Sequence, residues 1–202
     1  MTRTIAALLL VAVSSVAFAQ APANPPVRIR GTVEKLDGNM LTIKARNGQS
    51  MTVKLADNYT VMGVAKASLD DVGNGKFIGT TTVGERNRNL IAEEVHIFPE
   101  NMRGTGEGHY DWDLRPNSKM TNANVANVTS MGKDRVMTVQ YKGGEKKILV
   151  TSRTAVVSYE PASRSDLKPG TPVFINAAER QPDGTYSAPR VNVGLRGQIP
   201  PM

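Results

Sequence analysis

The amino-acid sequence predicts an all-β protein made of two tandem five-stranded barrels, each with one short helical turn. Apolar residues recur at every second position through most of the chain, which is the period of a strand with one buried face. Glycine-containing dipeptides separate these segments at the places where hairpins would turn. The same order of strands and turns then occurs a second time, which indicates an internal repeat.

Residues 1–19 have the features of a secretory signal peptide. A single charge at Arg3 precedes an apolar run from Ile5 to Phe18, and small residues lead to Ala19. The run is too short to cross a bilayer with polar flanks, so we expect cleavage after Ala19 and a periplasmic location rather than an uncleaved anchor helix. Residues 20–26 form a proline-rich lead-in that we expect to be disordered. No later segment is apolar enough to span a membrane.

The first predicted barrel covers residues 27–98. Apolar and polar residues alternate from Leu41, and the dipeptide Asn47-Gly48 supplies the positive φ angles of a tight hairpin turn. The hydroxyl of Ser68 is placed to cap a single helical turn, residues 68–71. The five strands are predicted over residues 27–36, 39–46, 51–55, 76–83 and 90–98, and a further short extended piece covers residues 60–64, before the helical turn.

The second predicted barrel covers residues 124–196. Residues 155–175 align with residues 60–80 at a constant offset of 95, which places Ser163 over Ser68. The segment AEEVHI, from Ala92, aligns with APRVNV at an offset of 96. The other strands of this half are predicted over residues 124–131, 135–142 and 146–151, and residues 197–202 form a tail.

Five strands with one helical turn before the fourth are typical of the OB-type barrel. Gly31 supports this interpretation, because a small barrel must coil its first strand sharply and glycine permits the bend. The alternative is one larger barrel or sandwich that uses all ten strands. We favour two OB-like barrels, because the helical turn recurs where each barrel would need a plug.

Three sequence segments resemble the bacterial exported domains of unknown function called DUF5666, which are OB-like. They are GTVEKLDGNMLTIKARNGQSMTVKL, SLDDVGNGKFIGT and AEEVHIF. The segment MRGTGEGHYDWDL is similar to that of small proteobacterial proteins often labelled metal ABC transporter permease. A permease needs several long apolar spans, which this chain lacks after the signal peptide. The resemblance therefore implies a fold and a hint of metal, but no established reaction.

Composition and charge exclude some functions. The chain has no cysteine, so disulfides and thiol chemistry are excluded. The formal net charge is +7, and residues 126–202 carry eleven Lys and Arg against six Asp and Glu. Such a basic half suits an anionic glycan, lipid or protein of the cell envelope, or serves only to keep the protein soluble. Nucleic acid is not expected as a partner, because aromatic residues make up 5% of the chain and the protein is predicted to be exported.

The connector, residues 99–123, holds the best candidates for a binding site. With alternation along an extended chain, the acids and His109 would share one face. Imidazole and carboxylate groups suit zinc or manganese. The candidate metal ligands are His96, Glu107, His109, Asp111 and Asp113.

The same alternation permits a second interpretation without metal. Tyr110 and Trp112 would occupy the opposite face, so Trp112 could anchor the connector between the barrels while the charges face water. In that case Arg103, Tyr110 and Trp112 are the candidate contacts for a small ligand.

No motif of the sequence indicates catalysis. There is no Gly-x-Ser-x-Gly elbow, and the glycine run that starts at Gly104 lacks the lysine of a phosphate-binding loop. Met102 and Met120 could bind copper(I), although core packing is the commoner use of methionine. We therefore expect a non-enzymatic periplasmic binding protein that holds a divalent metal or small ligand at the connector.

A basic group near the second barrel's hairpin suggests an alternative function. These residues could contact an anionic envelope component, or could discourage edge pairing of the hairpin. The members are Lys142, Lys146, Lys147 and Arg153.

Overall fold

The computed structural model describes residues 25–202. The predicted signal peptide, residues 1–19, and the first five residues of the predicted lead-in lie outside the described residues. The described part contains twelve strands and three single-turn 3-10 helices, so the all-β prediction is confirmed. No helix within it is long and apolar enough to cross a bilayer. The strands are β1 (Val27–Asp37), β2 (Met40–Ala45), β3 (Ser50–Lys66), β4 (Phe77–Arg86), β5 (Asn89–Ile97), β6 (Gly108–Asp111), β7 (Lys119–Met131), β8 (Asp134–Tyr141), β9 (Gly144–Val150), β10 (Ala155–Pro161), β11 (Pro172–Arg180) and β12 (Tyr186–Gly194).

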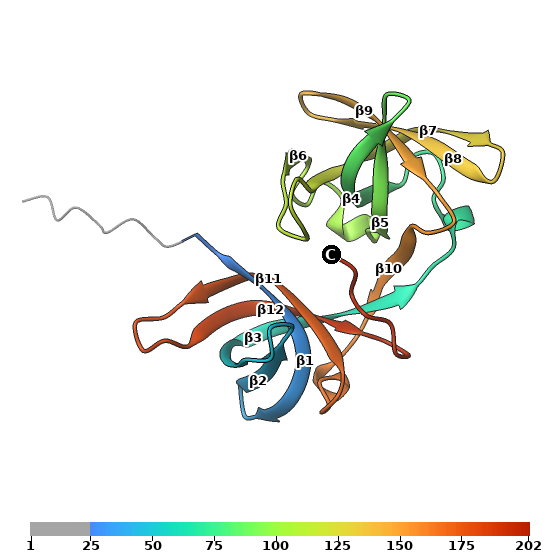
Figure 1. The fold of residues 1–202 in the computed structure, drawn as a ribbon. Coiled ribbons are helices and arrows are strands. Elements are labelled where there is room, and N and C mark those ends of the chain that lie inside the picture. Colours follow the sequence, from blue (N-terminus) through green and yellow to red (C-terminus); the bar gives the residue numbers. More distant parts are fainter. Residues whose placement is uncertain (1–24) are drawn as a thin grey trace, which may run out of the picture.

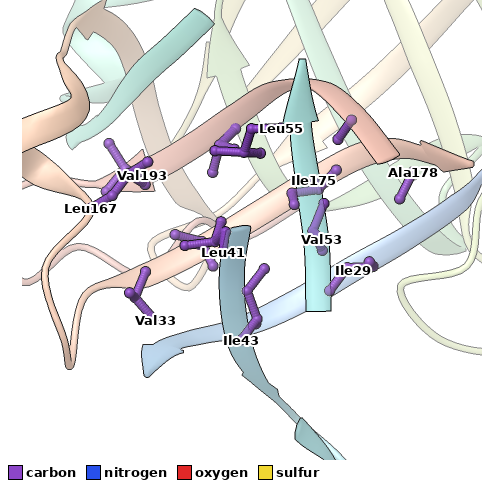
Figure 2. Close-up of a cluster of buried hydrophobic side chains, with 13 residues drawn as sticks. Ile29, Val33, Leu41, Ile43, Val53, Leu55, Leu167, Ile175, Ala178 and Val193 are labelled. Carbon is purple, nitrogen blue, oxygen red and sulfur yellow. The ribbon is translucent and has the colours of Figure 1, made fainter. Parts of the chain in front are cut away.

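Five strands from both ends of the chain form a closed barrel, which we call ring 1 (Figure 1). β1, β2 and β3 form an antiparallel meander, β11 and β12 follow on the other edge of β1, and a parallel pairing of β12 with β3 closes the ring. Its interior is apolar (Figure 2). The buried core includes Ile29, Leu41, Ile43, Leu55, Leu167, Ile175 and Val193.

The strands from the middle of the chain form a second group, which we call ring 2 (Figure 1). β5, β4, β7, β8 and β9 pair in that order, and β9 returns to β5 through the parallel partners Leu90↔Ile148 and Ile91↔Leu149. The buried core includes Val72, Ile78, Val95, Val125, Met137, Val139, Ile148 and Val150.

The prediction that residues 27–98 and 124–196 each form their own barrel is therefore not confirmed. Each half of the chain contributes its first three strands to one ring and its last two to the other. The helical turns follow the same exchange, because Val72 after the first turn packs in ring 2 and Leu167 after the later turn packs in ring 1. All strands belong to one continuous hydrogen-bonded network, with β6 as a side branch on β7.

Two extended segments cross between the rings. The second half of β3 pairs antiparallel with β10, with partners Met62↔Pro161, Val64↔Tyr159 and Lys66↔Val157. Adding 95 to the number of each β3 residue and subtracting 95 from that of its β10 partner gives the same set of pairs. A pseudo-two-fold axis therefore passes near Val64 and Tyr159. The sequence predicted a separate strand over residues 60–64, whereas β3 continues through it because β12 pairs along its length.

The predicted hairpin at Asn47-Gly48 is present, with a positive φ at Gly48 but not at Asn47. Both predicted helical turns are present, and in each a carboxylate three residues along accepts from the backbone N–H of the serine that starts the turn: Ser68 at 2.7 Å and Ser163 at 2.8 Å. A β-carbon on Gly31 would lie 2.3 Å from the carbonyl oxygen of Lys44. Only glycine therefore allows β1 to bend this closely over β2.

Candidate functional site

The predicted metal ligands do not come together. Within residues 25–202, no group of three or more His, Asp or Glu side chains is placed to hold a metal ion. β6 pairs with β7, which sets Lys119 opposite Asp111, and the two side chains form an ion pair. That contact lowers the pKa of the Asp111 carboxyl. Asp113 lies beyond the end of β6 and pairs instead with Arg30 of ring 1, at 2.7 Å.

The other two ligands predicted on the connector are also occupied. Glu107 accepts a hydrogen bond from the backbone N–H of Lys142, at 2.9 Å. Nδ1 of His109 lies 2.8 Å from the hydroxyl of Thr121, its pairing partner on β7. Burial, followed by the charge of Lys146, lowers the pKa of His109 below its ordinary value. Each of the four side chains is thus bound to a different residue, and the prediction of a shared metal site is not supported.

His96 lies elsewhere, in a buried pair with Glu94. The two residues are 3% and 1% exposed, and Nδ1 of His96 lies 3.0 Å from a Glu94 carboxylate oxygen. The other oxygen accepts from the backbone N–H and the hydroxyl of Thr81, at 3.0 and 2.8 Å. When the Glu94 carboxylate accepts from Nδ1–H, the neutral imidazole presents Nε2 as a hydrogen-bond acceptor.

Gly79 makes room for this imidazole. It pairs with His96 on β5 and with Asn122 on β7, and all three side-chain positions lie on the outward face of ring 2. A β-carbon on Gly79 would be 2.0 Å from Nε2 of His96 and 2.5 Å from Oδ1 of Asn122. Oδ1 of Asn122 therefore borders the space above this glycine as an acceptor, and Nε2 of His96 does so when Nδ1 carries the proton.

Aromatic rings continue the wall beside His96. Its ring centroid lies 4.8 Å from that of Phe98 and 5.8 Å from that of Tyr159, and the latter two are 5.4 Å apart. Tyr159 stands at the pseudo-two-fold axis, on the crossing strand β10. Burial, and then the charge of Glu94, raises the pKa of the Tyr159 phenol. This hydroxyl therefore stays protonated at neutral pH.

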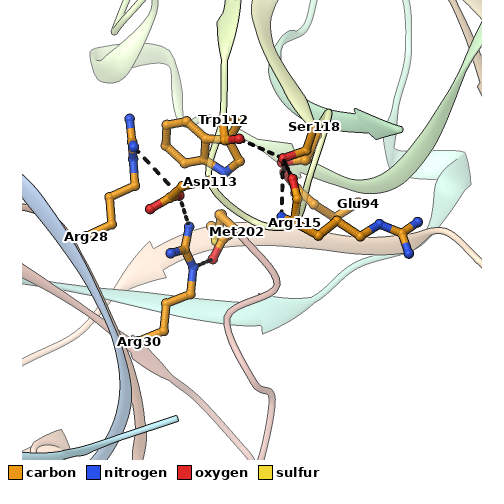
Figure 3. Close-up of polar contacts among 9 residues, drawn as sticks. Arg28, Arg30, Glu94, Trp112, Asp113, Arg115, Ser118 and Met202 are labelled. Carbon is orange, nitrogen blue, oxygen red and sulfur yellow. Dashed lines mark hydrogen bonds and ion pairs between the residues drawn. The ribbon is translucent and has the colours of Figure 1, made fainter. Parts of the chain in front are cut away.

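The connector also borders this space, with Trp112 and Asp113 beside Arg28 and Arg30 of β1 (Figure 3). Trp112 is 9% exposed and packs in a cluster with Met120 of ring 2 and Phe174 of ring 1. The Arg28 guanidinium lies 3.7 Å above the indole centroid. Asp113 adds ion pairs to the same strand β1, so the connector is fixed to both rings.

Together these walls enclose a cleft of about 200 Å³ between the rings. Two buried polar atoms at its edge have no hydrogen-bond partner in the described part of the chain: Oδ1 of Asn122, whose residue is 6% exposed, and Nε1 of Trp112. The polar and aromatic side chains that line it include His96, Tyr110, Trp112, Asn122, Tyr159 and Arg190.

Only part of the predicted ligand-binding set lies at this cleft. Tyr110 and Trp112 line it, as does His96 from the metal prediction. Arg103 does not, because its guanidinium bonds Glu100, Asn124 and the carbonyl oxygen of Gly75. Glu94 and Gly79 were not among the predicted site residues. Glu94 and His96 are two positions apart in a predicted strand, so the sequence already indicated that their side chains share one face.

The basic residues predicted as a binding patch do not form one surface. Lys146 and Lys147 are consecutive on β9, so their side chains point to opposite faces. Lys142 lies in the turn before this strand and Arg153 lies beyond its other end. The predicted patch is therefore divided among three directions.

The two halves of the repeat differ at the cleft. The 96-residue offset places Asn192 at the position of His96 and Arg190 at that of Glu94. The 95-residue offset places Phe174 at the position of Gly79, and the Asn192 amide donates to the Phe174 carbonyl at 3.2 Å. Both members of the first pair, His96 and Asn192, line the same cleft.

Comparison of the chain with protein-family models, with curated proteins and with solved structures found no match. The resemblance to DUF5666 therefore stays a prediction. What the cleft can bind has to be inferred from its own geometry and chemistry.

Proposed function

We propose that the protein is a non-enzymatic binding protein that holds a small organic ligand in the cleft between the rings. The observation that carries the proposal is the pair of unpartnered buried atoms, Asn122 Oδ1 and Trp112 Nε1, at an aromatic-lined cleft. Leaving a buried donor or acceptor without a partner costs about 1–3 kcal/mol. A ligand that supplies one acceptor and one donor would recover this free energy.

The lining also supports an organic ligand over zinc or manganese. Phe98, Tyr159 and Trp112 offer large apolar surfaces with few polar groups between them, which is typical of small-molecule sites. The acids that were predicted to hold a metal are instead paired with Lys119 and Arg30.

We further propose that the rings are two OB-like barrels that exchange their last two strands, in a protein exported to the periplasm. The support for the fold is the strand order of each ring, together with a helical turn whose following apolar residue, Val72 or Leu167, enters the core. The support for export is the N-terminal sequence pattern.

The alternative function is an interaction module that contacts anionic envelope components through its basic residues. Its support is weaker, because Lys146 and Lys147 point to opposite faces of β9. Salt-sensitive retention on an anionic lipid resin that is lost on charge reversal of these two residues would favour this alternative.

The proposed function is tested by thermal shift with a panel of small ligands, including indole, benzamide, phenylalanine and leucine. Ligands that bind the cleft should raise the melting temperature by mass action. Trp112→Phe keeps an aromatic ring but removes the indole N–H, and should reduce the shift. Tyr186→Phe, which removes a hydroxyl beside the core of ring 1, is the matched control and should leave the shift unchanged.

Two outcomes would contradict the proposal. One is that no member of the panel raises the melting temperature. The other is that zinc or manganese raises it and His109→Ala abolishes the rise, which would restore the metal prediction.

A further inference from the structure

Equivalent positions of the repeat near the cleft hold an acidic residue in one half and a basic residue in the other. Glu94 on β5 corresponds to Arg190 on β12. The carboxylate of Glu94 lies directly behind His96, whereas Arg190 itself lines the cleft. A pocket with a carboxylate behind one wall and a guanidinium on the other favours a ligand that carries both a cationic donor and an anionic group.

The ring 2 wall is a site for a hydrogen-bond donor. Oδ1 of Asn122 is buried and unpartnered within residues 25–202, and Nε2 of His96 borders the same space above Gly79. Glu94 places a negative charge behind the imidazole, which strengthens Nε2 as an acceptor. A ligand ammonium would supply several N–H donors to these two atoms, and its positive charge would be opposite to that of the Glu94 carboxylate.

The ring 1 wall is a site for an anion. Arg190 is exposed at the mouth of the cleft, and its Nε donates to the hydroxyl of Thr60 at 3.2 Å. It forms no ion pair with any residue in the described range 25–202. Arg28 and Arg30, in contrast, are both paired with Asp113. Arg190 is therefore the guanidinium at this cleft that can take a ligand carboxylate.

The space between the walls is apolar and small. Phe98 and Tyr159 line it beside His96, and Met120 lies opposite. Its volume of about 200 Å³ is below the roughly 300–1,000 Å³ of sites for drug-sized ligands. This size suits a molecule no larger than one amino acid with an apolar side chain.

We propose that the ligand is a small zwitterion of the amino-acid class, with its ammonium group at His96 and Asn122 and its carboxylate at Arg190. The inference rests on the proposed function and adds the ligand's chemistry. Neither charged end alone would satisfy both walls, so binding should require both groups in one molecule.

The test is calorimetric titration with two matched sets of ligands. The first set is L-leucine, 3-methylbutylamine, which lacks the carboxylate, and 4-methylpentanoate, which lacks the amine. The second set is L-phenylalanine, 2-phenylethylamine and 3-phenylpropionate. The zwitterion of at least one set should bind about tenfold or more tightly than both of its truncated partners.

Two variants test the orientation. Arg190→Gln should weaken zwitterion binding to the level of the amine, while leaving the affinity of the amine unchanged. Asn122→Leu should weaken the zwitterion and the amine, while leaving the affinity of the acid unchanged. Arg153→Gln, an exposed arginine that does not line the cleft, is the control and should have no effect.

The outcomes separate this inference from the proposed function. Equal affinity of a zwitterion and either truncated partner in both sets would overturn the inference. Binding of indole or benzamide that depends on Trp112, with no binding of either zwitterion, would also overturn it but leave the proposed function standing. Absence of binding by every compound would overturn both.

Discussion

Replacing Gly79 with alanine should destabilise the protein through a single buried contact. The added β-carbon would lie 2.0 Å from Nε2 of His96 and 2.5 Å from Oδ1 of Asn122, so both side chains, or the strand that carries Gly79, must move. His96 is held in place because its Nδ1 lies 3.0 Å from Glu94, and Thr81 fixes that carboxylate through two hydrogen bonds. The substitution therefore either strains the strand pairing or breaks the buried pair.

The magnitude follows from these two costs. Forcing an extra methyl group into a closely packed site costs about 1–3 kcal/mol. Separating His96 from Glu94 would leave a buried acceptor without its donor, which costs about 1–3 kcal/mol more. The two costs together give a loss of about 2–6 kcal/mol, which is large beside the roughly 5–15 kcal/mol that stabilises a typical domain.

Urea denaturation of the purified protein measures this loss. The matched control is Gly73→Ala, because a β-carbon there would meet no atom within 4 Å. That variant should be neutral or more stable by about 0.4–1 kcal/mol, since alanine restricts the unfolded chain. A change at Gly79 within about 0.5 kcal/mol of wild type would refute the geometry of the His96 wall.

A double-mutant cycle identifies the contact responsible. With His96→Ala already present, the imidazole is gone and the added methyl group at position 79 keeps only its contact with Oδ1 of Asn122, at 2.5 Å. The destabilisation by Gly79→Ala should then fall by about 1 kcal/mol or more. An equal loss in both backgrounds would show that His96 is not the cause.

Three further predictions concern the connector and the first helical turn. Burial alone would raise the pKa of the Asp113 carboxyl, but the hydrogen bond from Arg30 lowers this pKa below its ordinary 3.8. Wild type should therefore be more stable than Asp113→Asn at pH 7. It should lose this advantage as the pH falls through the lowered pKa of Asp113, so that the melting temperatures of the two proteins converge in thermal melts across pH. Burial and Lys146 lower the pKa of His109 below 6.5, so wild type should lose stability relative to His109→Gln as the pH falls from 6.5 through the folded value. Stabilities of wild type and His109→Gln that change in parallel with pH would contradict this prediction. Ser68→Ala removes the acceptor of a capping hydrogen bond, 3.1 Å long, and should cost about 1 kcal/mol in urea denaturation.

The strands and turns were predictable because their signals are local. Alternation, the turn at Asn47-Gly48 and the cap at Ser68 each depend on a few neighbouring residues. The exchange of strands between rings was not predictable in this way. Equivalent strands of a repeat have similar apolar faces, so the pattern is the same whichever ring a strand enters. The choice depends on whether residues 60–66 turn back or continue, and pairing with β10 and β12 keeps them extended.

The site was partly predictable for the same reason. The alternation that separates His109 and Asp111 from Tyr110 and Trp112 is present, because it follows from the strand itself. The neighbours of these side chains depend on the register of β6 on β7, which sets Lys119 opposite Asp111. A carboxylate beside a lysine or arginine is already neutralised. Asp111 and Asp113, which suited a metal in the sequence, form ion pairs with Lys119 and Arg30, and Glu107 accepts from a backbone N–H.

The exchange explains why the last strands of both halves border the cleft between the rings. β5 pairs with the crossing strand β10, and β12 pairs with the crossing strand β3, so the last strand of each half lies beside the pseudo-two-fold axis. His96 and Asn192, which occupy equivalent positions, consequently line the same space. Two identical walls would suit only a ligand with matching ends. Replacement of the Glu94 position by Arg190 in the second half makes the walls different, and a ligand bound between them would hold the two rings together.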